Sequence, residues 1–279
     1  MYIRANAKIN LGLNVKDNLP NGYHDLEMIM VPLNFYDELR IEIADQMSFK
    51  SNQTYVQVNP NNTIFTAITY LRDKYGFKEN FKIELNKQIP TRAGLAGGSA
   101  DGAATIKAVN ALLNLKMSDT ELKEAALAVG SDVYFCLINK PALVKGTGDI
   151  VEPFNCNCDF DILLVKPRSG VSTKESFSSL NLETCDHPDI TAMQTALENN
   201  DYPAFLKTLG NSLEEPSFKL NRRILKVKKQ LLNLGFDGAL MSGSGSTVFG
   251  ITKDQKILKD ARETMLKHGY FTRIVRILK

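Results

Sequence analysis

The segment Pro90–Asp101 combines residues that could hold an anion. Three glycines, Gly94, Gly97 and Gly98, follow closely on an alternating apolar stretch. Glycine tolerates positive φ angles and lets a ligand approach the backbone. Successive amide groups can then converge on an anion, and the positive end of a following helix adds to the attraction. The segment therefore predicts a phosphate-binding turn.

Ser99 stands where we expect the helix after this turn to begin, and two roles are open to it. Its hydroxyl could cap the helix, or it could face a phosphate or a cation bound to the phosphate. The segment has neither the Gly-Lys-Ser/Thr of a Walker A loop nor the spacing of the dinucleotide fingerprint. A glycine-rich turn alone is weak evidence, and its place between a strand and a helix strengthens it.

Charged residues elsewhere could serve acid–base or electrostatic chemistry. Lys8 and Asn10 lie two positions apart in an alternating stretch, so their side chains share one polar face. Most lysines on such a face are solvated. Asp132 follows Gly130 and Ser131 near the start of an apolar segment, where an aspartate is most often a helix N-cap. From the residues alone, the structural interpretation is favoured for the aspartate.

Hydrophobic periodicity predicts the elements that position these residues. In the first half we expect strands at residues 9–15, 26–35, 39–43 and 81–85, and helices at 62–75, 100–115 and 118–130. The last of these opens with a capping box at Ser118–Glu121 and ends at Gly130.

A change of composition near residues 153–158 indicates a linker, so we predict two domains, residues 1–155 and 156–279. In the second, strands are predicted at 160–166, 239–241, 247–251 and 271–278, with helices within 173–234 and at 254–268. With the intervening helices grouped, this is the β-α-β-β-α-β order of the ferredoxin-like split motif.

Basic residues cluster along a predicted helix near residues 219–229. The same helix carries an apolar stripe, made up of Leu220, Ile224, Val227 and Leu231. Lysine and arginine opposite such a stripe are usually solvated, so we favour that interpretation over nucleic-acid binding.

Composition excludes several classes of protein. The 279 residues include 34 Lys and Arg against 31 Asp and Glu, a net charge of +3. That balance argues against a protein that binds nucleic acid or a membrane through many phosphate contacts. No apolar run approaches the roughly 20 residues of a membrane span, and the N-terminus does not read as a signal peptide. The four cysteines predict neither a disulfide framework nor a metal site, so we expect a cytoplasmic protein.

Three ordered motifs resemble those of the GHMP kinases, the family named for galactokinase, homoserine, mevalonate and phosphomevalonate kinases. Ala7–Leu11 resembles the first motif, Pro90–Ser99 the second, and Met241–Phe249 the third, a glycine-rich loop that packs beside the phosphate loop. Three motifs in order are far more specific than any one of them. The resemblance implies an α+β fold with an N-terminal half like ribosomal protein S5 domain 2 and a ferredoxin-like C-terminal half.

Further segments resemble those family members that phosphorylate a hydroxyl on the methylerythritol part of a cytidine diphosphate conjugate. These segments are Asn21–Leu26, Gly130–Val133, Lys166–Thr173 and Asn211–Pro216. The resemblance implies a small-molecule kinase of non-mevalonate isoprenoid precursor synthesis, with ATP as the phosphoryl donor. Mg²⁺ is expected because it neutralises the β- and γ-phosphates.

The resemblance also implies roles for single residues. Asp132 would receive or orient the proton of the acceptor hydroxyl, and Lys8 would hold that carboxylate ionised and stabilise nearby charge. The ATP-binding residues would be Pro90, Thr91, Arg92, Ala93, Gly94, Leu95, Ala96, Gly97, Gly98, Ser99 and Ala100. Asn10, Tyr23, His24 and Phe177 would bind the acceptor, with the two aromatic residues stacking on the cytosine and the histidine bonding to its edge. The supporting glycine-rich loop would be Ser242, Gly243, Ser244 and Gly245.

Alternatives stay open at several of these positions. Tyr23 could be packed surface, His24 structural, and Phe177 a core residue of its helix. Arg92 and Ala96 stand where the family usually has a small residue and a glycine, and Ala96 would strain the loop if its φ were positive. The rival functions are a GHMP kinase for another small alcohol and a nucleotide-binding relative without turnover.

Overall fold

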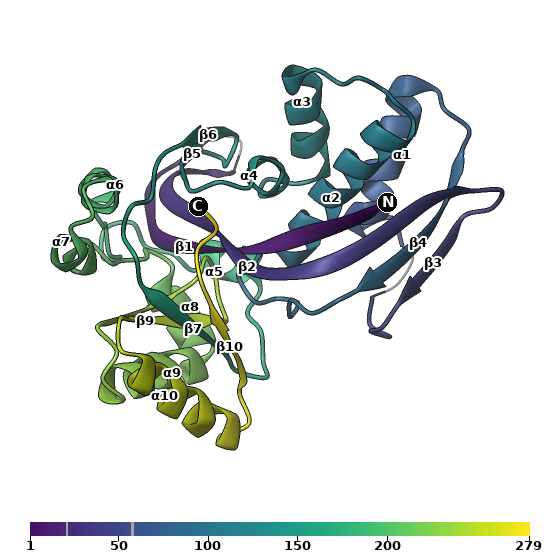
Figure 1. Ribbon diagram of the computed structural model, residues 1–279. Coiled ribbons are helices and arrows are strands. Elements are labelled where there is room, and N and C mark those ends of the chain that lie inside the picture. Colours follow the sequence, from purple (N-terminus) through teal and green to yellow (C-terminus); the bar gives the residue numbers. More distant parts are fainter. Residues whose placement is uncertain (21, 57–58) are drawn as a thin grey trace. The chain divides into compact units, whose positions relative to one another are not determined.

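The computed structural model describes residues 1–20, 22–56 and 59–279 (Figure 1). Within them the chain forms two compact units, each assembled from separate segments. Unit 1 comprises Met1–Lys8, Phe35–Pro90 and Ala96–Asn139, and unit 2 comprises Ile9–Asn34, Thr91–Leu95 and Lys140–Lys279. The boundary at residues 155 and 156 remains a prediction, and Asn21 of the acceptor motif lies outside the described residues.

Unit 1 combines helices with part of a sheet. Its elements include all or part of β1 (Tyr2–Asn18), β2 (His24–Ala44), β3 (Ser48–Ser51), β4 (Asn80–Asn86), α1 (Thr63–Tyr75), α2 (Gly97–Leu112), α3 (Asp119–Val129) and α4 (Val133–Ile138). Here β2 pairs antiparallel with β4, and β3 pairs parallel with β4. Helix α2 contacts α1, α3 and α4. It is rich in alanine and glycine, so neighbouring helices can approach it closely, and both of its ends are set by that packing.

One long strand replaces two predicted ones. The polar residues near Asp37 interrupt the apolar runs at 26–35 and 39–43, yet β2 continues through them. Asp37 is fully buried and forms an ion pair with Lys87, whose ammonium nitrogen lies 2.6 Å from its carboxylate. A buried charge with a partner does not end a strand, and that partner lies 50 residues away in sequence.

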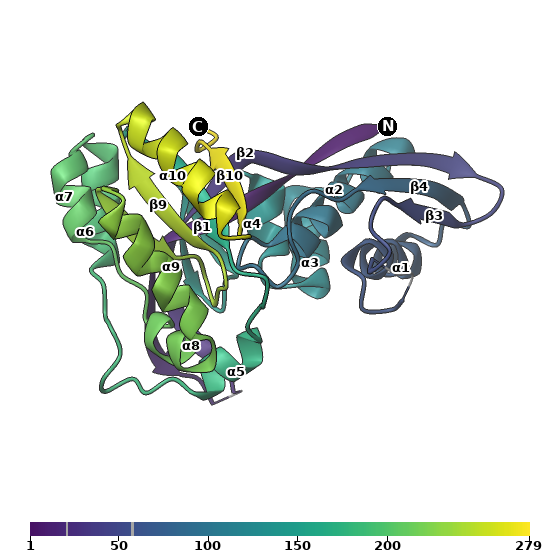
Figure 2. The same ribbon diagram turned by 90° about the horizontal axis from the view of Figure 1, so that it is seen from below.

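Unit 2 contains an antiparallel sheet in the order β10-β7-β9-β8. Its strands are β7 (Asp161–Lys166), β8 (Gly238–Met241), β9 (Val248–Thr252) and β10 (Phe271–Val275). Helices α9 (Arg222–Asn233) and α10 (Gln255–Lys267) cover one face of it (Figure 2). Counted along the chain, the fourth strand of this sheet lies beside the first, and the third and the second follow. This order confirms the ferredoxin-like arrangement.

The remaining elements of unit 2 connect or flank this sheet. They are β5 (Ala142–Gly146), β6 (Ile150–Pro153), α5 (Thr173–Ser178), α6 (Ile190–Glu198), α7 (Tyr202–Lys207) and α8 (Glu214–Leu220). Strand β5 pairs with the beginning of β2 and with β6. The strands β5 and β6 are short and were not anticipated from periodicity.

The predicted basic helix is two helices, because Asn221 ends α8 and caps α9. Ile224, Val227 and Leu231 are buried as predicted. Leu220 does not belong to that stripe, since it ends α8 and is exposed. Within the described part of the chain, no helix is long and apolar enough to cross a membrane.

Candidate active site

The beginning of the glycine-rich turn, Thr91–Leu95 in unit 2, is held by the second glycine-rich loop. Gly94 has a φ of 71°, and a Cβ there would collide with the carbonyl oxygen of Ser242, so glycine is required. The hydroxyl of Ser242 donates to the carbonyl of Gly94 at 2.8 Å. The amide of Thr247 donates to the carbonyl of Ala93 at 3.1 Å. The third motif therefore braces the second, as the resemblance implied.

The end of the turn, in unit 1, leaves the N-terminus of α2 open. The helix begins at Gly97, two residues before the predicted start. Ser99 thus lies within the first turn and does not cap the helix, and Ala96 at the N-cap offers no side-chain bond. Gly98 is exposed, and a Cβ there would meet only the hydroxyl of Thr63, 3.8 Å away. Open first-turn amides with no acidic side chain beside them suit an anion.

Both positions that depart from the family pattern carry strain. Arg92 has a φ of 48° and Ala96 a φ of 53°. The left-handed conformation costs a residue with a Cβ about 1–2 kcal/mol. The doubt raised by Ala96 in the sequence is therefore justified, since this alanine does adopt a positive φ.

The other predicted ATP-binding residues differ in how exposed they are. Ala93, Leu95, Gly97 and Ala100 are buried, Pro90, Gly94, Ala96 and Ser99 are half-buried, and Thr91, Arg92 and Gly98 are exposed. The buried residues can anchor the turn, and the accessible backbone near Gly98 and Ser99 is where a ligand could be received.

Lys8 and Asp132 form an ion pair in unit 1. The ammonium nitrogen lies 3.4 Å from a carboxylate oxygen, and the side chains are 6% and 32% exposed. Lys8 is therefore not a solvated surface lysine. Asp132 occupies the N-cap position of α4, yet its side chain makes no capping bond. The carboxylate faces a buried cation instead.

The candidate acceptor residues of unit 2 include two neighbouring rings. The ring centroids of His24 and Phe177 lie 4.8 Å apart with planes tilted by 35°. Phe177 is half-buried, so it is not a core residue of α5. Burial lowers the pKa of His24, which favours a neutral imidazole at pH 7. Tyr23 beside it is 63% exposed and could turn toward a ligand.

Asn10 lies beneath the second glycine-rich loop. Its side chain is almost fully buried and donates to the sulfur of Met28 at 3.1 Å, and its backbone amide donates to the hydroxyl of Ser242 at 3.3 Å. A Cβ on Gly243 would lie 3.2 Å from the side-chain oxygen of Asn10. Asn10 thus contacts the loop, and its role in binding the acceptor remains a prediction.

Residues not singled out by the sequence hold the loop Ser242–Gly245. The side chain of Asn211 donates to the carbonyls of Met241 and Gly243, each at 2.8 Å. Ser217 donates to the carbonyl of Ser244 at 3.2 Å, and the hydroxyls of Ser244 and Thr173 lie 2.9 Å apart. Asn211 and Thr173 lie in two of the segments that resemble the family. That resemblance is the sequence signal that could have identified them as residues of the site.

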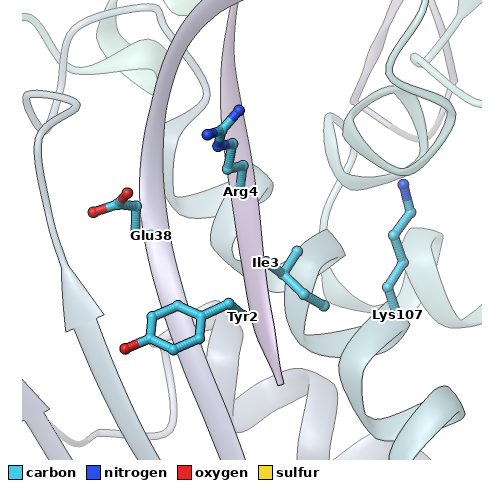
Figure 3. Close-up of a pocket in the computed structure, with 5 residues that line it drawn as sticks. All are labelled: Tyr2, Ile3, Arg4, Glu38 and Lys107. Atoms are coloured by element: carbon cyan, nitrogen blue, oxygen red, sulfur yellow. The ribbon is translucent and has the colours of Figure 1, made fainter.

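Unit 1 has a cavity of about 610 Å³ that none of the predicted site residues lines, and Figure 3 shows the residues around it. It is lined by Tyr2, Ile3, Arg4, Glu38 and Lys107. Side chains of both charges line it, and the guanidinium of Arg4 stacks on Tyr36 at 4.6 Å from the ring centroid. We assign no ligand to it.

Family models match both halves of the chain. The description "GHMP kinases N terminal domain" covers residues 62–140, and "GHMP kinases C terminal" covers residues 193–270. The 4-diphosphocytidyl-2-C-methyl-D-erythritol kinase of Geobacillus thermodenitrificans (strain NG80-2) is 39% identical over 90% of this chain and 88% of its own. The kinase of the same name from Geobacillus sp. (strain WCH70) is 36% identical over 93% and 90%.

The chain belongs to the GHMP kinase family.

Solved structures agree with this GHMP kinase fold. A crystal structure of 4-(cytidine 5'-diphospho)-2C-methyl-D-erythritol kinase superimposes with a TM-score of 0.81 at 28% identity, covering 99% of both chains. Homoserine kinase from Cytophaga hutchinsonii gives a TM-score of 0.74 at 19% identity over 97% of both chains, which shows a shared fold alone. The α+β fold expected for a GHMP kinase is confirmed.

Among the described residues of this GHMP kinase, no group of three or more His, Cys, Asp or Glu side chains could hold a metal ion. Mg²⁺ commonly keeps several waters and binds through substrate phosphates with one or two protein ligands. Mg²⁺ therefore remains a prediction for this chain.

Proposed function

We propose that this enzyme transfers the γ-phosphoryl group of ATP to a hydroxyl on the methylerythritol part of 4-diphosphocytidyl-2-C-methyl-D-erythritol. The observation that carries the proposal is the ion pair between Lys8 and Asp132, at the positions that the family motifs give to the catalytic residues. Relatives of that name, similar over nearly the whole chain, support the choice of acceptor.

Phosphoryl transfer asks the protein mainly for positioning and for neutralising charge. Asp132, partly exposed, accepts a hydrogen bond from the acceptor hydroxyl and orients its oxygen toward the phosphorus. Lys8, buried beside it, holds the carboxylate in place and stabilises negative charge on the phosphoryl oxygens. A carboxylate without this cation would be less well placed for either role.

The first turn of α2 binds the phosphates of ATP. The backbone at Gly98 is exposed, no side chain caps the helix, and the half-buried Ser99 lies in its first turn. Mg²⁺ bound to the β- and γ-phosphates would supply further neutralisation of charge, with the hydroxyl of Ser99 as a candidate ligand.

The cytosine is recognised by Tyr23, His24 and Phe177. Stacking on aromatic rings accepts any base, so selectivity must come from hydrogen bonds to the base edge. A neutral His24 offers one donor and one acceptor nitrogen for that purpose. We also propose a cytoplasmic location, because buried and unpaired cysteines suit a reducing compartment.

Release of ADP in the presence of ATP and Mg²⁺ tests this function. The purified protein is offered the cytidine conjugate, mevalonate, homoserine or no acceptor. We expect release of ADP with the conjugate well above the control without acceptor. Equal or faster release of ADP with mevalonate or homoserine would instead identify a kinase for another alcohol. If no acceptor increases the release of ADP, the protein is a relative without turnover.

A further inference from the structure

A buried ionic triad lies at the base of the phosphate loop. The ammonium nitrogen of Lys87 is 2.6 Å from a carboxylate oxygen of Asp37 and 2.6 Å from one of Asp101. The three side chains are at most 6% exposed. Charges are buried in this way only when partners hold them, so the geometry of the triad is closely fixed.

The triad joins both ends of the loop within unit 1. On the entering side, the other oxygen of Asp37 accepts the backbone amides of Gln88 and Ile89 at 2.5 and 2.8 Å. The backbone of Lys87 is held by Asn52, whose side-chain oxygen accepts its amide at 2.7 Å. The strand residues just before Pro90 are therefore anchored through Asp37 and Asn52.

On the leaving side, Asp101 belongs to the second turn of α2. The backbone of the first turn also packs closely against the lysine. A Cβ on Gly97 would lie only 3.0 Å from the ammonium nitrogen and 2.9 Å from the side chain of Ile89. Lys87 is thus the group that fixes where α2 starts relative to the strand before the loop. Backbone amides that bind phosphates must be positioned to within a fraction of an ångström.

We propose that Lys87 is a positioning residue for nucleotide binding, tying the strand that enters the phosphate loop to the helix that leaves it. Its ammonium group is buried and held by both carboxylates, so it acts through the geometry of the backbone rather than by contact with ATP. One oxygen of Asp101 has no hydrogen-bond partner among the described residues, and burial raises the pKa of this carboxyl group. Asparagine at position 101 keeps the shape of the side chain and removes its charge. This inference rests on the proposed function.

The test compares Lys87→Met with Lys87→Met/Asp101→Asn. The single variant leaves two buried carboxylates without their cation and is expected to lose stability. The double variant removes one of those carboxylates, and the other, Asp37, keeps the amides of Gln88 and Ile89, so its melting temperature should recover toward the wild-type value. Because the tie to α2 is still missing, its KM for ATP should stay raised by about tenfold or more, while its KM for the acceptor stays near the wild-type value.

If Lys87 contributes to stability alone, the double variant gives a different result. In that case the KM for ATP returns to the wild-type value together with the melting temperature, and the proposal is overturned. The matched control is Lys82→Met, on strand β4. Lys82 is 48% exposed and pairs with Glu42 at 3.1 Å, so neither KM should change.

Calorimetric binding of a non-hydrolysable ATP analogue separates this inference from the proposed function. If the wild-type protein binds the analogue but turns over no acceptor, the proposed function fails and the role of Lys87 is still measured. The double variant should bind the analogue about tenfold or more weakly. Binding equal to that of the wild-type protein would contradict the inference.

Discussion

Ala96 and Arg92 show how far single residues can deviate from a family pattern while the loop keeps its shape. Both adopt the left-handed conformation, with φ angles of 53° and 48°. Glycine at these positions would avoid that strain. Arg92 and Ala96 are therefore expected to make the protein less stable than glycine would.

Ala96→Gly should raise the free energy of unfolding by up to about 1 kcal/mol, because relief of the left-handed strain exceeds the extra chain entropy of glycine. Denaturant unfolding measures it. The control is Ala100→Gly, inside α2, which should destabilise by about 1 kcal/mol as glycine does in helices. A loss of stability in both variants would show that Ala96 is not strained.

Phe177→Ala should raise the KM for the cytidine conjugate by about 5- to 150-fold, the equivalent of one lost stacking contact of 1–3 kcal/mol. The KM for ATP should not change, since Phe177 contacts the ring of His24, a residue proposed to bind the base. Tyr23→Ala should show the same selectivity. Equal increases in both KM values would refute a role in binding the base.

At the scale of elements, periodicity predicted most helices and missed what depends on distant partners. Helices α1, α3 and α10 lie close to their predicted bounds because their apolar residues recur with the helical period. Strand β2 was divided at its polar centre because nothing local reveals that Lys87 will neutralise Asp37. The start of α2 was placed too late because Gly97 and Gly98 have poor intrinsic helix propensity, which packing overrides.

The candidate site shows the same division. The glycine-rich turn followed from residue types alone, whereas Lys8 and Asp132 became candidates only through the family resemblance, since either could be an ordinary surface or capping residue. Their ion pair joins residues more than a hundred positions apart. Asn211 and Ser217 were missed because their bonds go to backbone carbonyls of a distant loop.

Two glycines of the loop separate a structural requirement from a functional one. Gly94→Ala should destabilise the protein, because a Cβ there collides with the backbone of Ser242 and the φ is positive. Gly98→Ala should keep the stability of the wild-type protein, since the nearest atom is the hydroxyl of Thr63 at 3.8 Å.

If ATP phosphates lie against the backbone of Gly98, the added methyl group should nevertheless raise the KM for ATP. Unfolding curves and steady-state kinetics of both variants check this pair of outcomes. A Gly98→Ala enzyme with unchanged KM for ATP would place the phosphates elsewhere.

At the scale of the whole molecule, the compact units do not follow the chain from end to end. Segment Ile9–Asn34 belongs to unit 2, where Leu13 exchanges backbone hydrogen bonds with Gly210 and Ser212. Asn34 and Pro32 bond to the backbone of Arg276 and Leu278 in the same way. The C-terminal half of the sequence therefore depends on strands from the N-terminal half.

A fragment of residues 156–279 should accordingly fail to unfold cooperatively, because it lacks those strands and leaves their backbone partners unpaired. Circular dichroism during thermal unfolding, with the full chain as the control, measures this. A sharp transition in the fragment would support an independent domain at the boundary predicted from composition.

The most direct test of the account is the rate of phosphoryl transfer in a single turnover, measured with ATP, Mg²⁺ and the cytidine conjugate for the wild-type enzyme and for Asp132→Asn. Asparagine keeps the shape of the side chain but cannot accept a proton or hold Lys8 by charge. The account predicts a rate lower by roughly 10²–10⁴, with binding of both substrates retained. An unchanged rate would contradict it.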